Sequence, residues 1–295
     1  FFSPSGKIRA FDEHADGYVR SDGIVVVVLK RATDVRPGTD RPYALILGTA
    51  VNQDGRSNGL TAPNRKGQED LLRAACQAAG VNPADVDYVE TQGTGTPIGD
   101  SLEAAALGAV YGEGRPADAP LRIGSVKTNI GHTETASGVT SLIKVALALE
   151  HRTLPPSLHF RRPNPAIPFS DLKLQVQTQL NPWPRRERLP LAGISAFGFG
   201  GTNVHALLQG VDQGEVDSAA DDAEYPSLLL LSARSESALK ELALRFQPLL
   251  SDPSLSWRDL CYSAAVHRQH HEWRLVLKAE DALSALNRLG GYLNG

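Results

Sequence analysis

The sequence has no methionine and only two cysteines among its 295 residues. Cys76 and Cys261 have neither the spacing of a metal site nor enough partners for a disulfide framework, so we expect neither feature. Long hydrophobic runs are also lacking, since the longest strongly apolar stretch, Ile24–Leu29, is far too short to cross a bilayer. Without a secretion signal, the expected location is the cytoplasm. We interpret a sequence that opens at Phe1 and contains no methionine as a fragment of a longer protein.

The sequence also lacks a large excess of positive or negative charge. The formal net charge is −3 and the sequence pI is about 6.3. Because the chain has no basic surplus and no clustered Lys/Arg tract, we predict that it binds neither nucleic acid nor an anionic membrane surface. A content of 41% hydrophobic and 21% charged residues is typical of a soluble globular protein. The length suits one large domain and a small second one.

Strand and helix patterns alternate along the first two thirds of the sequence. Ile24–Leu29 is continuously apolar and β-branched, which predicts a strand buried on both faces. Lys66–Ala79 has helical periodicity, and Asp100 with Glu103 forms a capping-box pattern at the start of another helix. Further strands are expected at Tyr43–Gly48, Val86–Glu90, Ile123–Val126 and Asn203–Leu208, and a further helix at Thr135–Leu149. This alternation indicates an α/β fold with a largely parallel sheet.

The composition changes after residue 210. Gly210–Glu224 is acidic, rich in Ala, Asp and Ser, and without apolar periodicity, which is typical of a linker. The residues that follow predict a small α+β unit. Its expected elements are a strand at Ser227–Leu231, helices at Ser235–Leu250 and Trp257–Val266, and a strand at Trp273–Lys278.

Two loops that follow predicted strands carry polar side chains. Gln92–Pro97 is a Gly/Thr turn, which lets backbone approach a ligand closely and offers the hydroxyls of Thr94 and Thr96. Lys127–His132 places a lysine and a histidine before a helix, where the histidine can act as a base or donate to a developing oxyanion. Ligands of open α/β sheets bind beyond the carboxyl ends of the strands. The alternatives are a plain strand-to-helix connection and a structural histidine.

A third segment, Phe197–Asn203, can aim backbone N–H groups at an oxyanion, although a tight turn or β-bulge has the same composition. Together, the three segments resemble those of the thiolase-like condensing enzymes, and specifically the ketosynthase domains of modular polyketide synthases. The resemblance covers most of residues 1–210. It also rests on the blocks Ala10–Val19, Val51–Asn64, Gly95–Asp100 and Ser125–Thr133.

The resemblance implies a fold and a division into domains. We expect an α/β chain that forms the C-terminal lobe of the layered thiolase-like fold, with a small α+β linker domain appended. Residues 1–40 correspond to the tail of the N-terminal lobe and residues 41–210 to the C-terminal lobe. Residues 211–224 are the flexible linker, and residues 225–295 resemble an incomplete ketosynthase–acyltransferase linker domain.

The family passes an acyl chain from a carrier-protein phosphopantetheine to a cysteine and then condenses it with a decarboxylated extender unit. By resemblance, His132 is the second catalytic histidine and Lys127 the supporting lysine. Thr94 and Thr96 match the hydroxyls that hold the pantetheine arm. Phe199 matches the residue that gates the pocket and contributes a backbone N–H to the oxyanion hole. The residues of the oxyanion loop and its support are Phe199, Gly200 and Asn203.

Two departures from the family pattern change the expected activity. Neither cysteine fits the nucleophile motif, so the nucleophile is absent from this chain and both thiols are interpreted as small buried hydrophobes. The first catalytic histidine is replaced by Gln92, whose amide donates a hydrogen bond but does not titrate near neutrality. We therefore predict that the chain alone is inactive and that its parent elongates poorly.

The resemblance implies several partners and leaves rival functions open. The partners are an acyl carrier protein, which supplies the phosphopantetheine, an acyltransferase domain of the same polypeptide, and the missing N-terminal lobe. No tightly bound cofactor is expected. We expect the parent to form a homodimer, but we do not expect the fragment to dimerise. A non-elongating transacylase and a scaffold without chemistry are the alternatives, and a thiolase is disfavoured by the block at residues 52–64 and by the attached linker.

Overall fold

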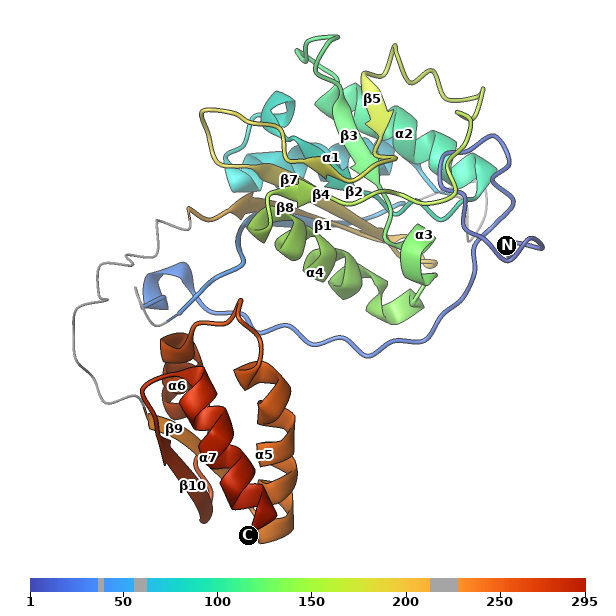
Figure 1. Ribbon diagram of the computed structural model, residues 1–295. Coiled ribbons are helices and arrows are strands. Elements are labelled where there is room, and N and C mark those ends of the chain that lie inside the picture. The colour runs from blue at the N-terminus through green and yellow to red at the C-terminus, as the bar shows by residue number, and fades with distance from the viewer. Residues whose placement is uncertain (37–39, 56–62, 213–227) are drawn as a thin grey trace. The chain divides into compact units, whose positions relative to one another are not determined.

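The computed structural model describes residues 1–36, 40–55, 63–212 and 228–295 (Figure 1). The chain divides into two compact units, Phe1–Gln213 and Gly214–Gly295. Almost all of the predicted linker at residues 211–224 lies outside the described residues, as does most of the predicted loop at residues 55–59. The expected division into four segments therefore stays a prediction.

A six-stranded sheet forms the centre of the first unit. Its order is β1-β8-β7-β2-β3-β5. The strands are β1 (Ala44–Gln53), β2 (Tyr88–Glu90), β3 (Leu121–Gly124), β5 (Leu174–Val176), β7 (Leu191–Phe197) and β8 (Thr202–Gly210). The pairs from β7 through β2 and β3 to β5 are parallel, whereas β8 is antiparallel to both β1 and β7. The sheet is mixed rather than largely parallel, because only four residues join β7 to β8 and so short a connection forms a hairpin.

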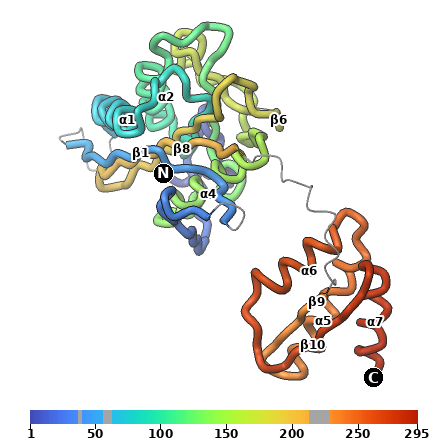
Figure 2. Tube along the Cα trace, turned by 90° about the vertical axis from the view of Figure 1, so that its left-hand side faces the viewer, coloured from blue at the N-terminus to red at the C-terminus, as the bar shows by residue number. Residues whose placement is uncertain are grey.

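Helices cover both faces of this sheet (Figures 1 and 2). One face carries α1 (Arg65–Ala79) and α2 (Pro97–Tyr111), and the other carries α4 (Ser137–Glu150). Successive residues of a strand point to opposite faces, so Val89 of β2 packs with α1 and α2 while Tyr88 packs with α4. This layered arrangement confirms the predicted α/β class.

The helix predicted at residues 66–79 is confirmed as α1. Asn64 caps it by accepting hydrogen bonds from the N–H groups of Lys66 and Gly67. Gly80 ends the helix in the left-handed conformation, with φ 64°. The shorter elements of the unit are α3 (Lys127–Ile130), the two-stranded pair of β4 (Thr153–Leu154) and β6 (Asn181–Pro182), and the 3-10 turns Ala32–Asp34, Pro83–Asp85 and Glu134–Ala136.

Two local predictions are wrong. Ile24–Leu29 forms no strand, and Ile24 and Val28 are 98% and 94% exposed. A strand needs a neighbouring strand for its N–H and C=O groups, and the described residues supply none beside this segment. Asp100 does not cap α2, because the helix begins earlier, with Thr96 as N-cap and Pro97 in its first turn.

The second unit is a small α+β structure. The strands β9 (Leu228–Ala233) and β10 (Trp273–Lys278) pair antiparallel. Its helices are α5 (Glu236–Leu250), α6 (Trp257–Val266) and α7 (Ala282–Asn294). Leu229 and Leu231 alternate inward from β9 onto the helices. The predicted elements of this unit are all present within one or two residues, and α7 was not predicted.

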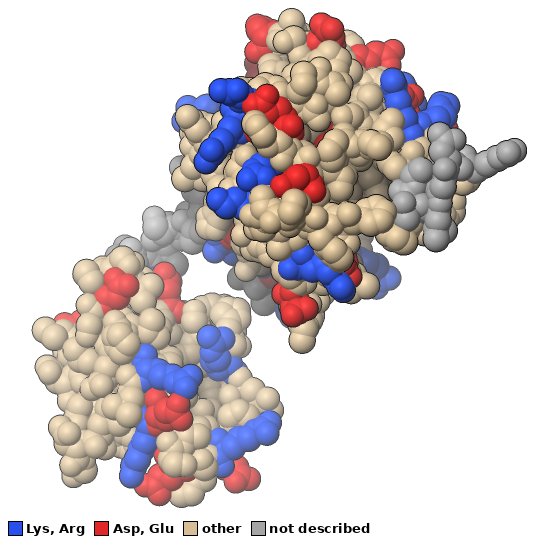
Figure 3. Space-filling view, turned by 90° about the vertical axis from the view of Figure 1, so that its right-hand side faces the viewer, with Lys and Arg blue, Asp and Glu red and all other residues tan. Residues whose placement is uncertain are grey.

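Neither unit shows a large surface region of one charge on the face drawn in Figure 3. On the face seen in Figure 3, basic and acidic side chains are interspersed over each unit. Among the residues that the structure describes, no helix has both the length and the hydrophobicity that crossing a bilayer requires.

Candidate functional site

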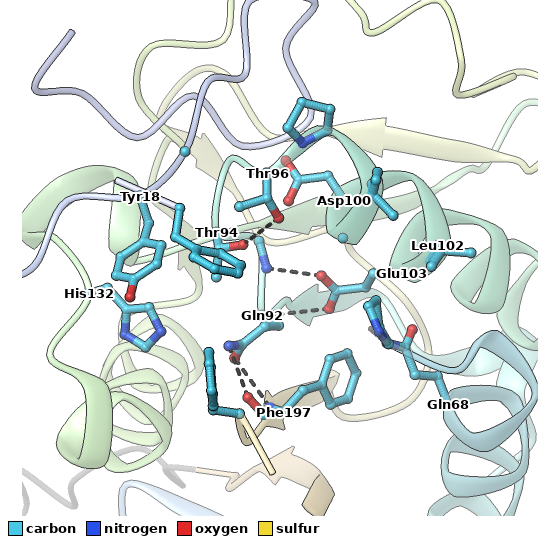
Figure 4. Close-up of a pocket in the computed structure, with 18 of the residues that line it drawn as sticks. Tyr18, Gln68, Gln92, Thr94, Thr96, Asp100, Leu102, Glu103, His132 and Phe197 are labelled. Atoms are coloured by element: carbon cyan, nitrogen blue, oxygen red, sulfur yellow. Dashed lines mark hydrogen bonds between the residues drawn. The ribbon is translucent and has the colours of Figure 1, made fainter. Parts of the chain in front are cut away.

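A cavity of about 740 Å³ opens in the first unit (Figure 4). Part of its wall comes from loops that follow the carboxyl ends of the neighbouring strands β7, β2 and β3, where an open α/β sheet binds ligands. The predicted site residues that line it are Gln92, Thr94, Thr96, His132 and Phe199. The predicted site residues that lie outside the lining are Lys127, Gly200 and Asn203.

Two buried carboxylates hold the loop that carries Gln92. Glu103 accepts hydrogen bonds from the backbone N–H groups of Gln92 at 2.7 Å and Gly93 at 2.9 Å. Asp100 accepts one from the N–H of Gly95 at 3.2 Å. Burial raises the pKa of both carboxyl groups to about 7. The sequence pattern had suggested that these acids cap α2, but in the fold they fix the loop in front of it.

The hydroxyl groups of Thr94 and Thr96 lie side by side on the cavity wall. Their oxygens are 3.0 Å apart. Gly99 leaves room for them, since a Cβ at that position would lie 2.5 Å from the Thr96 hydroxyl oxygen. Each hydroxyl both donates and accepts, so the pair can bind the amide groups of an extended polar chain.

His132 faces the same cavity as a neutral hydrogen-bond donor. Its Nδ1 accepts a hydrogen bond from the backbone N–H of Glu134 at 2.9 Å, which leaves the ring proton on Nε2. Burial and the nearby charge of Lys127 lower the pKa of His132 to about 4. At neutral pH the imidazole therefore offers an N–H to an anionic oxygen without carrying a charge of its own.

Lys127 lies behind the cavity and contacts Gln92. It is only 2% exposed, and burial lowers its pKa. Its Nζ donates to the Oε1 of Gln92 at 3.4 Å. The same Oε1 accepts from the N–H of Phe197 at 3.3 Å, while the Nε2 of Gln92 donates to the Phe197 carbonyl at 3.2 Å. The Gln92 amide is thus bound to the end of β7 (Figure 4).

The glycine-rich turn between β7 and β8 forms the mouth of the cavity. Phe199 is 67% exposed and meets the ring of Phe1 edge-on, with 6.2 Å between centroids. Asn203 is buried behind the turn, where its Nδ2 donates to Asp54 Oδ1 at 2.7 Å and to Asn52 Oδ1 at 3.4 Å. Asn203 therefore ties the turn to β1 and does not reach a ligand.

Neither cysteine has the surroundings of a nucleophile. Cys76 is buried on α1 beside the Tyr111 hydroxyl, at 3.7 Å, and burial raises its pKa. Burial raises the pKa of Cys261 to about 11. Neither residue lines the cavity, and an activated thiol needs access and a lowered pKa. Within the described ranges, no group of three or more His, Cys, Asp or Glu side chains could hold a metal ion.

The structure adds residues that sequence patterns did not place in the site. Phe1, Asp16 and Tyr18 line the cavity, although they belong to the segment that was interpreted as a tail. The block containing Asp16 and Tyr18 contributed to the resemblance, but its spacing gives no sign that it folds back over residues more than 70 positions later. Such a contact depends on the tertiary fold.

Comparisons with protein families match almost the whole chain. Residues 43–161 match the β-ketoacyl synthase C-terminal domain, and residues 163–276 match the ketoacyl-synthetase C-terminal extension. Residues 1–35 match the β-ketoacyl synthase N-terminal domain.

The relatives are polyketide synthases. A phenolphthiocerol/phthiocerol polyketide synthase of Mycobacterium tuberculosis is 56% identical over 99% of this chain, which spans 16% of that protein. The ketosynthase from module 6 of the bacillaene synthase of Bacillus subtilis superposes with a TM-score of 0.87 at 36% identity, over 100% of this chain and 51% of that one. Ketosynthase twelve of the bacillaene polyketide synthase in Bacillus amyloliquefaciens superposes with a TM-score of 0.89 at 35% identity. The superposition covers 100% of this chain and 51% of that one.

These matches confirm the predicted thiolase-like fold. They also show that the chain spans about half the length of the solved ketosynthases and about a sixth of the mycobacterial relative. The chain therefore belongs to the β-ketoacyl synthase family, in which it is homologous to the ketosynthase domains of polyketide synthases.

Proposed function

We propose that this chain forms the carrier-facing part of a polyketide β-ketoacyl synthase and that its parent transfers acyl groups but condenses them poorly. The observation that carries the proposal is the gathering of Thr94, Thr96, Gln92 and His132 around one cavity. In this proposal the cavity receives an acyl thioester on the phosphopantetheine of a carrier protein, and no cofactor resides in the chain itself.

The threonine pair and His132 have separate parts in this proposal. The two hydroxyls bind the amide groups of the pantetheine arm. Loss of CO₂ from a malonyl-type thioester leaves its electron pair as an enolate, and the Nε2–H of His132 donates to the enolate oxygen. A neutral donor is suited to this step, because it stabilises the negative oxygen without transferring a proton to the carbanion that must attack the acyl thioester.

Gln92 is the reason to expect poor condensation. Its side-chain amide is already engaged by the Phe197 peptide and by Lys127. Its remaining amide hydrogen takes the place of the ring N–H that the family's first histidine supplies, and the contacts with Phe197 and Lys127 fix its direction. In this proposal that hydrogen does not reach the oxyanion, and loss of one donor to a transition-state oxyanion lowers a rate by roughly 10²–10³-fold. Acyl transfer to the parent's cysteine depends less on this position than condensation does.

A second candidate function is a scaffold without chemistry, and the cysteines favour it for the chain alone. Neither thiol lies at the cavity, so no acyl-enzyme can form there. In that case the two units hold a carrier protein and an acyltransferase domain of the same polypeptide in place. The threonine pair and the neutral His132 favour the first candidate, since a scaffold needs neither.

Intact-protein mass spectrometry distinguishes the acyl-transferring synthase from the scaffold. The parent synthase, containing this chain together with its N-terminal ketosynthase domain, is offered an acyl thioester and a malonyl-carrier protein. We expect a mass increase equal to the acyl group and very little β-ketoacyl product. Absence of any acyl adduct on a folded parent supports the scaffold instead.

A further inference from the structure

The aromatic ring of Tyr18 covers His132 on the cavity wall. The two ring centroids are 5.1 Å apart, and the planes are inclined by 59°. Phe2 also packs against Tyr18, with 5.2 Å between centroids. Figure 4 shows Tyr18 and His132 next to each other at one end of the cavity, opposite Glu103. His132 is thus approached by an aromatic side chain from a segment more than 100 residues earlier.

The backbone on either side of this contact is fixed. The N–H of His132 donates to the carbonyl of Val19 at 2.7 Å, and the N–H of Ser21 donates to the carbonyl of His132 at 3.0 Å. Tyr18 is itself held at both its N–H and its carbonyl, by Phe1 at 3.0 Å and by Ser3 at 2.9 Å. These hydrogen bonds hold the two backbone segments side by side, so the rings can separate only by rotation of a side chain.

We propose that Tyr18 is a positioning residue that holds the His132 imidazole at the cavity wall and keeps water from its ring. The importance of His132 for acyl chemistry rests on the function proposed above, whereas the contact itself does not. Tyr18 touches no reacting atom in this proposal. It acts through the histidine, by limiting the orientations of the ring, whose Nε2–H is left to donate once Nδ1 accepts from Glu134.

The electrostatic surroundings of His132 make this role measurable. The charged groups around it are Lys127, whose charge disfavours protonation of the ring, and the ion pair between Arg20 and Glu134, at 2.8 Å. Burial is the largest cause of the low pKa of His132, about 4. Removal of the covering ring admits water and thereby moves the pKa back toward the ordinary value of about 6.5.

The test is an NMR titration of this chain labelled with ¹³C-histidine, in which the His132 signal is assigned by its loss in His132→Gln. We expect Tyr18→Ala to raise the pKa of His132 by at least one unit. Tyr18→Phe keeps the ring and should leave the pKa within about 0.3 of the wild-type value. Tyr43→Ala removes an exposed tyrosine of the same unit and should change nothing.

The fluorescence of buried Trp183, measured with phenylalanine at positions 257 and 273, checks that each variant is folded. If Tyr18→Ala does not fold, Tyr18→Leu replaces it, with a smaller rise expected because leucine covers less of the imidazole. An unchanged pKa in the folded alanine or leucine variant overturns the proposal. Because no acyl substrate is present, this outcome is independent of acyl loading. A raised pKa in this chain combined with an unloaded parent would contradict only the proposed function.

Discussion

Gly131, directly before His132, should tolerate no side chain. Its backbone has φ 84° and ψ −179°, a conformation that costs residues other than glycine about 1–3 kcal/mol. A Cβ there would also lie 2.9 Å from both the Cβ and the Oγ of Ser21 and 3.2 Å from the carbonyl oxygen of Val19. Overpacking of this kind adds about 1–3 kcal/mol. Gly131→Ala should therefore lower the free energy of unfolding of the first unit by about 2–6 kcal/mol.

Urea denaturation measures this change, and the tryptophans allow the first unit to be observed separately. Trp183 belongs to the first unit, whereas Trp257 and Trp273 belong to the second, so phenylalanine at the latter two positions leaves one reporter.

Gly114→Ala is the matched control for Gly131→Ala. Gly114 also has a positive φ, 67°, but a Cβ there would meet nothing within 4 Å, which predicts a cost of about 1–2 kcal/mol from the backbone alone. A cost for Gly131→Ala no larger than that of this control would contradict the close approach of Val19 and Ser21 to Gly131.

Two further predictions concern α7 and the pH dependence of stability. Gly290→Ala and Gly291→Ala fill open space on α7, so each should stabilise the second unit by about 0.5–1 kcal/mol. Urea denaturation followed by the fluorescence of Trp257 and Trp273, with phenylalanine at position 183, measures this change. The pKa of His132 is about 4 in the folded chain, below its ordinary value of about 6.5. As the pH falls, the unfolded chain therefore takes up this proton before the folded chain does. The contribution of the neutral ring to stability is present above pH 6.5 and is lost as the pH falls toward 4. The difference in unfolding free energy between wild type and His132→Ala should therefore shrink by about 3 kcal/mol over that range. Subtraction at each pH removes the opposite trend of Asp100 and Glu103, whose pKa values are raised to about 7.

Elements with a strong local pattern could be predicted from the sequence. α1 has apolar residues at helical spacing, a side-chain cap and a terminal glycine, and each of these signals agrees with the fold. The loops of the site could be located because their residues follow short apolar strands. Residues 198–201 form a tight turn, which the composition of the segment had left open, but β7 before it was missed because Gly193 lies within the strand.

Other features depend on contacts that sequence spacing does not contain. Ile24–Leu29 has the composition of a buried strand, but strand formation requires a partner. Asp100 and Glu103 match a capping box, yet α2 begins at Pro97 and turns both carboxylates toward the preceding loop. α7 contains two consecutive glycines, which weaken its helical pattern, and packing on the neighbouring strand and helix forms it instead. The contact between Tyr18 and His132 arises only from the fold.

In the proposed function Gln92 limits condensation, and its replacement by histidine in the parent synthase tests this limit most directly. The measurement is the rate of β-ketoacyl product formation by mass spectrometry, after equal acyl loading of wild type, Gln92→His and Gln92→Ala. We predict that Gln92→His raises the rate by roughly 10²–10³-fold, whereas Gln92→Ala, which removes the amide and adds no imidazole, gives no gain. A wild type that condenses rapidly, or a histidine variant that loads normally and condenses no faster, would contradict the account.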